Sequence, residues 1–314
     1  MNETDIIERF FQRPCTDPAV TRHIGDDSAV LTPTDGTQLV VTTDAMVEEH
    51  HFVSQSPAHA IGYKLMAVNV SDLAAMGATP RWATLSLTLP SIDEDWLTSF
   101  SRGLFECADH YHVELVGGDL SAGKQYTMSV QLIGEIAHGK ALLRNSAQPD
   151  DAIYISGEIG HAGAALSKLA QAAYDHTVLN ECEMKALYYP PAQVQLGQGL
   201  CHLAHACIDI SDGLLHELDS ICRQSQCGAE INLEHITTSC ELEPLEAIVQ
   251  GDDYQLLFTA RADQHTHIEQ LAQRLGLAVC RIGQMTQHPQ LVIKQHGRVM
   301  PTPERHGYDH FSPA

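Results

Sequence analysis

Six aspartates stand within two residues of a glycine, serine or threonine at points where the pattern of the sequence changes. Carboxylate and hydroxyl oxygens are the ligands that magnesium prefers. Each aspartate also has a structural explanation, because turns and helix ends favour the same residue types. Taken together, the six predict a site for several divalent cations. They are Asp27, Asp44, Asp72, Asp119, Asp209 and Asp212.

Asp72 lies in a segment of small and apolar residues that runs from Pro57 to Gly77 and Pro80. The segment predicts a helix, and glycine followed by proline is a common helix stop. An ionised carboxylate among apolar neighbours is costly unless it reaches water, a hydrogen-bond donor or a cation. Asp72 is therefore either a partly exposed helical residue or a metal ligand.

Two other acidic positions lie near a predicted strand. The Gly-Asp-Asp-Ser sequence at 25–28 suits a plain turn as well as a cation site. The β-branched run at 39–44 predicts a buried strand whose end presents Thr42, Thr43 and Asp44. These groups are hard oxygen ligands, and they equally suit hydrogen bonds to the backbone of a following loop.

Three further positions combine acids with turn residues. Gly-Gly-Asp at 117–119 follows a predicted strand, where paired glycines would let a phosphate approach, although hairpin turns use the same residues. Asp209, Ser211 and Asp212 lie at a predicted strand-to-helix junction, where Ser211 or Asp212 is either a helix N-cap or part of a second cation cluster. Asp252 follows Gly251 directly before another predicted strand.

The remaining patterns predict alternating helices and strands that would position these groups. A glycine-rich turn at 157–163 matches neither the dinucleotide nor the P-loop pattern and favours a structural turn. The predicted helices are 3–11, 93–111, 193–205 and 265–275, and the predicted strands are 82–89, 113–116, 126–136, 152–156, 206–211, 255–259 and two short ones near Cys280 and Val292.

The composition limits the classes of function. A length of 314 residues with 44% hydrophobic and 18% charged residues predicts two packed domains, which we place at 1–148 and 149–314. The 18 basic and 40 acidic residues give a net charge of −22, which argues against nucleic acid or an anionic membrane as a partner. A phosphorylated small substrate would therefore need divalent cations to offset its charge.

Targeting and redox signals are absent from the sequence. It has no signal-peptide pattern and no apolar run long enough to span a bilayer, so we expect a cytoplasmic protein. The nine cysteines include no Cys-x-x-Cys pair, and His50-His51 is the only adjacent pair among 19 histidines. We therefore expect neither disulfides nor a zinc site.

These motifs, in their order along the chain, resemble those of the thiamine-monophosphate kinase family. This family belongs to the superfamily named for aminoimidazole ribonucleotide synthetase and selenophosphate synthetase. The matching segments run from residue 25 to residue 311 and thus cover nearly the whole chain. They are Gly-Asp-Asp-Ser-Ala at 25–29, Thr-Thr-Asp at 42–44, Glu48 with His51-Phe52, the segment 69–78, Gly-Gly-Asp at 117–119, Arg144, Asp-Ile-Ser-Asp-Gly-Leu at 209–214, Gly-Asp-Asp-Tyr at 251–254 and Gly-Tyr-Asp-His-Phe at 307–311.

The resemblance implies ATP-dependent phosphorylation of thiamine monophosphate to thiamine diphosphate, the last step in making that cofactor. It also implies several Mg²⁺ ions between ATP and substrate, and it leaves a K⁺ requirement open. The implied catalytic residues are Asp44, Asp72 and Arg144. The implied metal ligands are Asp27, Thr42, Thr43, Asp44, Asp72, Asp119, Asp209 and Asp212; the implied ATP contacts are Tyr111, Gly118, Asp119, Arg144 and Ser211; and the implied substrate contacts are His51, Asp252 and Tyr308.

The implied fold has two α/β domains (α+β), with an N-terminal mixed sheet that pairs across a homodimer and a C-terminal α/β domain. One segment departs from the family pattern, because Gln-Gly-Asp-Asp-Tyr-Gln at 250–255 stands where Gly-Gly-Glu-Asp-Tyr-Glu is usual. Asp252 is shorter than the usual glutamate, so its contact with substrate could require a bridging water.

Two alternatives remain open from the sequence. Another member of the superfamily is one, but a selenophosphate synthetase would normally carry a reactive cysteine in a glycine-rich N-terminal segment, and Cys15 stands beside Pro14 without such glycines. A non-catalytic protein that binds nucleotide or thiamine phosphate is the other. An assay for thiamine diphosphate distinguishes all three.

Overall fold

The computed structural model describes residues 1–239, 242–308 and 311. It divides into two compact units, which we describe separately. Unit 1 comprises Met1–Leu73 and Ala78–Gly139, and unit 2 comprises Ala74–Gly77 and Lys140–Ala314. No helix within the described ranges combines the length and the hydropathy that a bilayer span requires.

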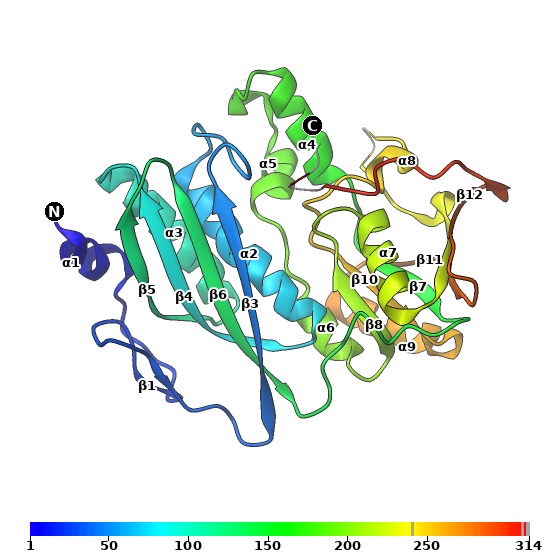
Figure 1. Ribbon diagram of the computed structural model, residues 1–314, viewed down its shortest axis with the longest axis horizontal. Coiled ribbons are helices and arrows are strands. Elements are labelled where there is room, and N and C mark those ends of the chain that lie inside the picture. The colour runs from blue at the N-terminus through cyan, green and yellow to red at the C-terminus, as the bar shows by residue number, and fades with distance from the viewer. Residues whose placement is uncertain (240–241, 309–310, 312–314) are drawn as a thin grey trace. The chain divides into compact units, whose positions relative to one another are not determined.

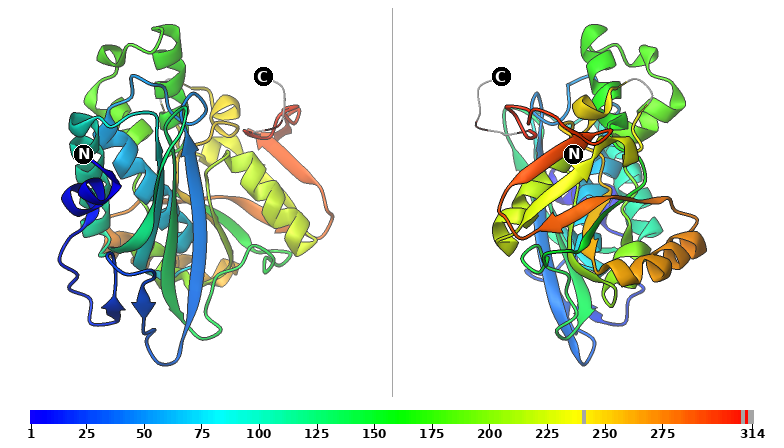
Figure 2. Two further views of the ribbon diagram at one scale, coloured as in Figure 1. Left: turned by 60° about the vertical axis from the view of Figure 1, so that its left-hand side comes forward. Right: turned by 90° about the vertical axis from the view of Figure 1, so that its right-hand side faces the viewer.

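Unit 1 is built on a four-stranded mixed sheet with the strand order β3-β6-β4-β5. Strands β4 and β5 are parallel, and the other neighbouring pairs are antiparallel. Two long helices, α2 and α3, cover one face of this sheet (Figures 1 and 2). The bounds are β3 Thr37–Val47, α2 Ala58–Ala75, β4 Thr79–Leu89, α3 Glu94–His110, β5 Glu114–Ala122 and β6 Thr127–Ala137.

The N-terminal residues of unit 1 form a short helix and a small hairpin. Helix α1, Glu3–Ile6, begins at a capping box between Asn2 and Asp5 and continues as a π-helical turn, Ile7–Phe11, which confirms the helix predicted at 3–11. Strands β1, Val20–Arg22, and β2, Val30–Leu31, then pair antiparallel. This hairpin lies beside the lower end of the sheet in Figure 1.

Unit 2 is built on a seven-stranded sheet in the order β13-β12-β9-β11-β7-β10-β8. Among the described strands of this sheet, only the β12–β9 pair is parallel. The strands are β7 Ala152–Ser156, β8 Ala204–Asp209, β9 Gly228–Asn232, β10 Leu256–Ala260, β11 Val279–Thr286, β12 Leu291–Gln295 and β13 Arg298–Val299, and the helices are α4 His161–Gln171, α5 Glu181–Tyr188, α6 Val194–Leu200, α7 Leu214–Ser225, α8 Pro244–Ala247 and α9 His265–Leu275.

The central strands of unit 2 are buried on both faces. Alternate residues of β7 divide between two apolar clusters, because successive side chains of a strand point to opposite faces. Ile153 and Ile155 pack in the cluster that includes Leu214 of α7. Tyr154 packs in the other cluster with Leu196 of α6 and Ile268 of α9. Helices on both faces therefore hold the sheet that carries the second set of predicted site residues.

Two strand predictions in unit 1 were wrong in their boundaries. The run at 39–44 is not a buried strand that ends at Asp44, because β3 is an edge strand that continues to Val47 and leaves Leu39 and Val41 about half exposed, at 48% and 54%. Likewise, β5 does not end before Gly117 but continues to Ala122. In both cases pairing with a neighbouring strand carries the chain past polar or glycine residues that suggested a strand end.

Two helix predictions in unit 2 also need correction. The helix predicted at 193–205 ends at Leu200, because residues from Ala204 onward pair with β10 as strand β8. The helix that follows Asp212 begins at Leu214, and its N-cap position, Gly213, has no side-chain hydrogen bond. Neither Ser211 nor Asp212 is therefore the helix N-cap, which removes the structural explanation offered for these two side chains.

Candidate functional site

Strand β3 and helix α2 bring three oxygen-bearing side chains of unit 1 together, which we call the N-terminal donor group (Thr42, Asp44 and Asp72). Thr42 Oγ1 donates a hydrogen bond to Asp72 Oδ2 at 2.5 Å. The backbone N–H of Asp44 donates to Asn69 Oδ1 at 2.9 Å. Residues two apart on a strand share a face, and residues three apart on a helix do so too, so the two contacts reinforce each other.

The local sequence of α2 explains this close approach. Asn69 and Ser71 are fully buried, and the Asn69 amide nitrogen donates to Leu65 O at 2.9 Å, which orients its oxygen towards β3. Asp72 is only partly buried, so its carboxylate is accessible to a ligand as well as to Thr42. This small-residue helix therefore packs beside the strand that carries Asp44.

Three predicted metal ligands of unit 1 lie apart from this group. Thr43 alternates to the opposite face of β3, and its Oγ1 donates to Val130 O at 3.1 Å. Asp119 is exposed on β5, at the other edge of the sheet from β3. Asp27 is exposed in the β1–β2 connection, where its N–H donates to Asp26 Oδ1 at 3.0 Å. Within the described ranges, none of these three side chains hydrogen-bonds to the N-terminal donor group.

The other predicted residues of unit 1 have clear local environments. Gly118 is required by packing, because a Cβ there would lie 1.9 Å from Leu85 O of the neighbouring strand. Tyr111 ends α3 with its ring against His110, at 4.6 Å between ring centroids. His51 Nδ1 accepts a hydrogen bond from the Val47 N–H at 3.1 Å, which leaves the proton of a neutral ring on Nε2.

In unit 2, backbone hydrogen bonds join three segments that are distant in sequence. The Asp252 N–H donates to Ser211 O at 2.7 Å, and the Tyr308 N–H donates to Asp212 O at 2.9 Å. Asp209 is buried at the end of β8, directly before this junction. The structure therefore brings the predicted residues of the strand-to-helix connection, the 251–254 loop and the C-terminal segment together. Asp309 and His310 of the last motif lie outside the described residues.

Sequence reasoning missed two members of a second cluster, which we call the C-terminal donor group (Asp212, His216 and Glu217). One ligand atom from each lies within 4.8 Å of the others. Glu217 is buried and accepts hydrogen bonds from the Asp212 N–H at 3.3 Å and from Ser211 Oγ at 3.4 Å. The available signal was the position of His216 and Glu217 about one helical turn after Asp212.

The loop that carries Asp252 has little conformational freedom. A Cβ at Gly251 would lie 2.3 Å from Ser211 O, so only glycine permits this approach. Asp252 and Tyr254 adopt positive φ angles of 72° and 49°, which are uncommon for residues with a side chain. The Tyr254 hydroxyl donates to Asp252 Oδ1 at 3.0 Å and so orients the carboxylate.

Burial dominates the electrostatics of this region. It raises the pKa of Glu217, although His216, the Asp212 N–H and the Arg144 charge lower it in part. Arg144 is exposed, and its charge has the weakest of these influences on the pKa of Glu217. Burial also raises the pKa of Asp253 to about 8, even though the Gly160 N–H donates to both of its oxygens at 2.9 and 3.0 Å.

Comparison with known proteins identifies the family of a chain with these features. The description "AIR synthase related protein, N-terminal domain" matches residues 25–136, and the corresponding C-terminal domain matches residues 148–295. The thiamine-monophosphate kinase of Haemophilus influenzae is 34% identical over 99% of this chain and 98% of its own length. The chain belongs to the thiamine-monophosphate kinase family. A crystal structure of the thiamine-monophosphate kinase of Stenotrophomonas maltophilia K279a covers 95% of this chain and 96% of its own, with 37% identity and a TM-score of 0.83.

Within the thiamine-monophosphate kinase family, one solved structure is that of AaThiL complexed with AMPPCP and TMP. It is 28% identical to this chain, has a TM-score of 0.77 and covers 93% of each chain. Both donor groups fall in the regions that the two domain descriptions match, whereas Arg144 and Tyr308 lie just outside them. The oxygen donors of both groups suit Mg²⁺, and only His216 offers a softer nitrogen ligand.

Proposed function

We propose that this chain transfers the γ-phosphoryl group of ATP to thiamine monophosphate and releases ADP and thiamine diphosphate. Full-length family membership indicates this reaction. The observation that carries the proposal is the contact of Thr42 with Asp72 beside Asp44, because it places hard oxygen donors together on a long strand and a long helix of unit 1. Such donors are what a magnesium-dependent phosphoryl transfer requires.

The proposed chemistry is a direct in-line displacement. A terminal phosphate oxygen of thiamine monophosphate forms a bond to the γ-phosphorus, and the bond from that phosphorus to the β,γ-bridging oxygen breaks with its electron pair leaving on ADP. The attacking oxygen is already anionic at neutral pH, so no strong general base is needed. A phospho-enzyme trapped with labelled ATP in the absence of acceptor would contradict this route.

We assign the site residues to three roles, which are Mg²⁺ binding, ATP binding and substrate binding. Asp44 and Asp72 would hold Mg²⁺ in unit 1 with Thr42 as a further ligand. Asp27, Thr43 and Asp119, which lie apart from this group, would contact separate Mg²⁺ ions, and Asp209 and Asp212 would hold Mg²⁺ in unit 2. Bound Mg²⁺ supplies positive charge next to the phosphates. Arg144, Tyr111, Gly118 and Ser211 would contact ATP, and Arg144 would offset charge that develops during transfer. His51, Asp252 and Tyr308 would orient thiamine monophosphate.

The decisive experiment incubates the purified chain with ATP, Mg²⁺ and thiamine monophosphate and measures thiamine diphosphate and ADP by chromatography. We expect equal amounts of both products, and none after chelation of Mg²⁺. Thiamine in place of its monophosphate is the acceptor control. Binding of ATP or thiamine monophosphate without product would identify a non-catalytic binding protein and refute the proposal.

The family resemblance also leads us to propose a cytoplasmic homodimer that pairs through the sheet of unit 1. The exposed edge strand β3 supports this proposal, since Leu39 and Val41 are about half exposed and a long apolar edge is a liability in a monomer. We expect Val41→Lys to shift the molar mass measured by light scattering from dimer to monomer. The exposed Gln38→Lys is the matched control, and a wild-type monomer would refute the dimer.

A further inference from the structure

The hairpin that carries Asp27 is too small to hold its own position. Strands β1 and β2 are three and two residues long, and their pairing is limited to Val20 with Leu31 and Arg22 with Val30. Isolated two-stranded hairpins are marginal in water even when they are longer. Its Val30 side chain is 51% exposed, so burial adds little. The position of Asp27 must therefore be set where the hairpin joins the sheet.

The residues just before β1 and just after β2 donate hydrogen bonds to carboxylates at this junction. On the entering side, Asp17 Oδ1 accepts from the Ala19 N–H at 2.9 Å, directly before β1. On the leaving side, Glu135 of β6 accepts from the Thr34 N–H at 2.6 Å and from Thr34 Oγ1 at 2.9 Å. A further bond, from the Thr32 N–H to Ala19 O at 2.8 Å, closes the base of the hairpin.

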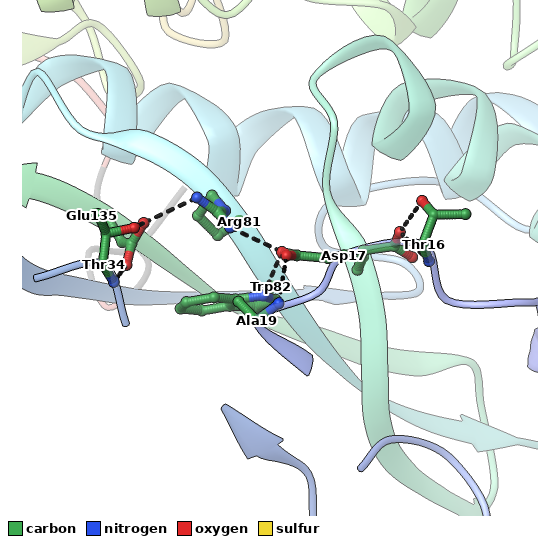
Figure 3. A network of polar contacts seen from close by, with 8 residues as sticks. Thr16, Asp17, Ala19, Thr34, Arg81, Trp82 and Glu135 are labelled. Carbon is green, nitrogen blue, oxygen red and sulfur yellow. Dashed lines mark hydrogen bonds and ion pairs between the residues drawn. The ribbon is translucent and has the colours of Figure 1, made fainter. Parts of the chain in front are cut away.

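One arginine of the sheet joins these two carboxylates (Figure 3). Arg81 of β4 donates from Nη2 to Asp17 Oδ2 at 2.9 Å and from Nη1 to Glu135 Oε2 at 3.0 Å. The three side chains, which we call the Arg81 clamp (Asp17, Arg81 and Glu135), are 13%, 27% and 6% exposed. Trp82 Nε1 also donates to Asp17 Oδ2 at 3.0 Å, so the Asp17 carboxylate is anchored from two adjacent residues of β4.

The chemistry of the clamp is specific to arginine. A guanidinium is planar and presents its donors as a fork, so it bridges two carboxylates that an ammonium could contact only one at a time. Removing it would leave two poorly solvated carboxylates facing each other without a cation. Burial alone would raise the pKa of Asp17, but hydrogen bonds from the Ala19 N–H, Arg81 and Trp82 hold it below its usual value.

We propose that Arg81 is a positioning residue for the reaction, which acts by fixing the base of the hairpin that presents Asp27 to Mg²⁺. This inference rests on the proposed function for the role of Asp27 and on the contacts above for the role of Arg81. In this role the clamp acts through the hairpin and not by contact with substrate or metal. Because the clamp orders the hairpin before Mg²⁺ binds, less of the binding free energy of Mg²⁺ is offset by the cost of ordering the hairpin.

The test compares Arg81→Met with wild type by hydrogen exchange and by the Mg²⁺ dependence of turnover. We expect amides of residues 20–31 to exchange about tenfold faster, because local opening then requires no rupture of the clamp. The Mg²⁺ concentration for half-maximal turnover should rise about tenfold, while kcat at saturating Mg²⁺ stays within about twofold, since coupled contacts of this kind contribute by about this factor. Arg81→Lys should give an intermediate Mg²⁺ requirement.

Arg13→Met is the matched control. Arg13 forms an ion pair with Asp109 at 3.0 Å, in the same N-terminal stretch but away from the hairpin base. Its loss should leave both readouts unchanged. Thr34→Val removes only the hydroxyl bond to Glu135, so it tests the same effect at smaller amplitude should Arg81→Met fold poorly.

The outcomes separate this inference from the proposed function. An unchanged Mg²⁺ requirement in Arg81→Met and in Thr34→Val would overturn the positioning role, and so would unchanged exchange of residues 20–31. A fall in kcat with no change in Mg²⁺ requirement would also overturn it, because a purely structural defect lowers the active fraction alone. Absence of thiamine diphosphate with wild type would refute the proposed function instead, and hydrogen exchange would still decide whether Arg81 orders the hairpin.

Discussion

The two donor groups are positioned by different means. In the N-terminal group, side chains extend from a strand and a helix, and Thr42 and Asp72 meet because β3 and α2 pack side by side. In the C-terminal group, Asp212 lies in a connection whose place is set by backbone bonds from two other loops. Regular elements fix a side chain through the cooperativity of the whole sheet, whereas connections fix it through a few local hydrogen bonds. The first group should therefore be rigid, and the second should respond to its neighbours.

The largest expected effect is a loss of turnover without a loss of stability, which distinguishes side chains that act in the reaction from those that stabilise the fold. We expect Asp72→Asn or Asp44→Asn to lower turnover by at least about a hundredfold, because each removes a charge from the cation site. Stability should change by less than about 1 kcal/mol, since the amide oxygen that replaces the carboxylate can still accept a hydrogen bond. Steady-state kinetics and urea unfolding measure the two effects. Asp35→Asn, an exposed change before β3, is the control, and normal turnover in both site variants would refute the metal assignment.

The second effect tests rigidity directly with two glycines. Gly118→Ala would press a Cβ against Leu85 O, within the sheet, and should cost about 1–3 kcal/mol of global stability. Gly251→Ala would press against Ser211 O and should instead raise the KM for thiamine monophosphate with a smaller loss of stability. Gly117→Ala, whose Cβ would have only an ordinary contact at 3.7 Å, is the control. Equal losses of stability at 118 and 251 would remove the proposed difference between the regions.

The third effect concerns pH and unit 2. Asp253 has a pKa of about 8 when folded, against about 3.9 in an unfolded chain, so the folded state binds more protons between these values. Its contribution to stability is complete below about pH 4 and is lost as pH rises through about 8. The free energy of unfolding, measured with urea, should fall between about pH 5 and about pH 8 in wild type, and we expect this fall to be smaller in Asp253→Asn. The fall should be unchanged in the exposed Asp263→Asn, and a parallel fall in both variants would contradict the assignment.

Much of the fold was predictable because local patterns agreed with the final structure. The helices predicted at 93–111 and 265–275 and the strand at 152–156 are confirmed as α3, α9 and β7. The burial of a strand was less predictable, since it depends on how many neighbours the strand acquires. Leu39 and Val41 have the composition of a core strand, yet β3 lies at the edge of its sheet.

The sequence indicated candidate residues for the site, but it did not indicate which of their side chains share a face or meet across distant segments. The sequence grouped Thr42 with Thr43, but the period of a strand sends their side chains to opposite faces. In the sequence, His216 and Glu217 look like ordinary surface residues of a helix. Their proximity to Asp212 follows only from the position at which the helix begins. The contacts of Arg81 span 54 and 64 residues, and no local pattern indicates them.

The edge strand β3 also has a consequence for folding fidelity. It carries two identical doublets, Val40-Val41 and Thr42-Thr43, in an eleven-residue pairing with β6. If β3 slipped by one residue against β6, Val41 would occupy the position of Val40 and Thr43 the position of Thr42. The sheet and the hydroxyl contact would then survive, but Ala45 would occupy the position of Asp44. Such a molecule would keep native-like spectra and lack one carboxylate. The specific activity of a preparation would then report the fraction of chains whose register is correct.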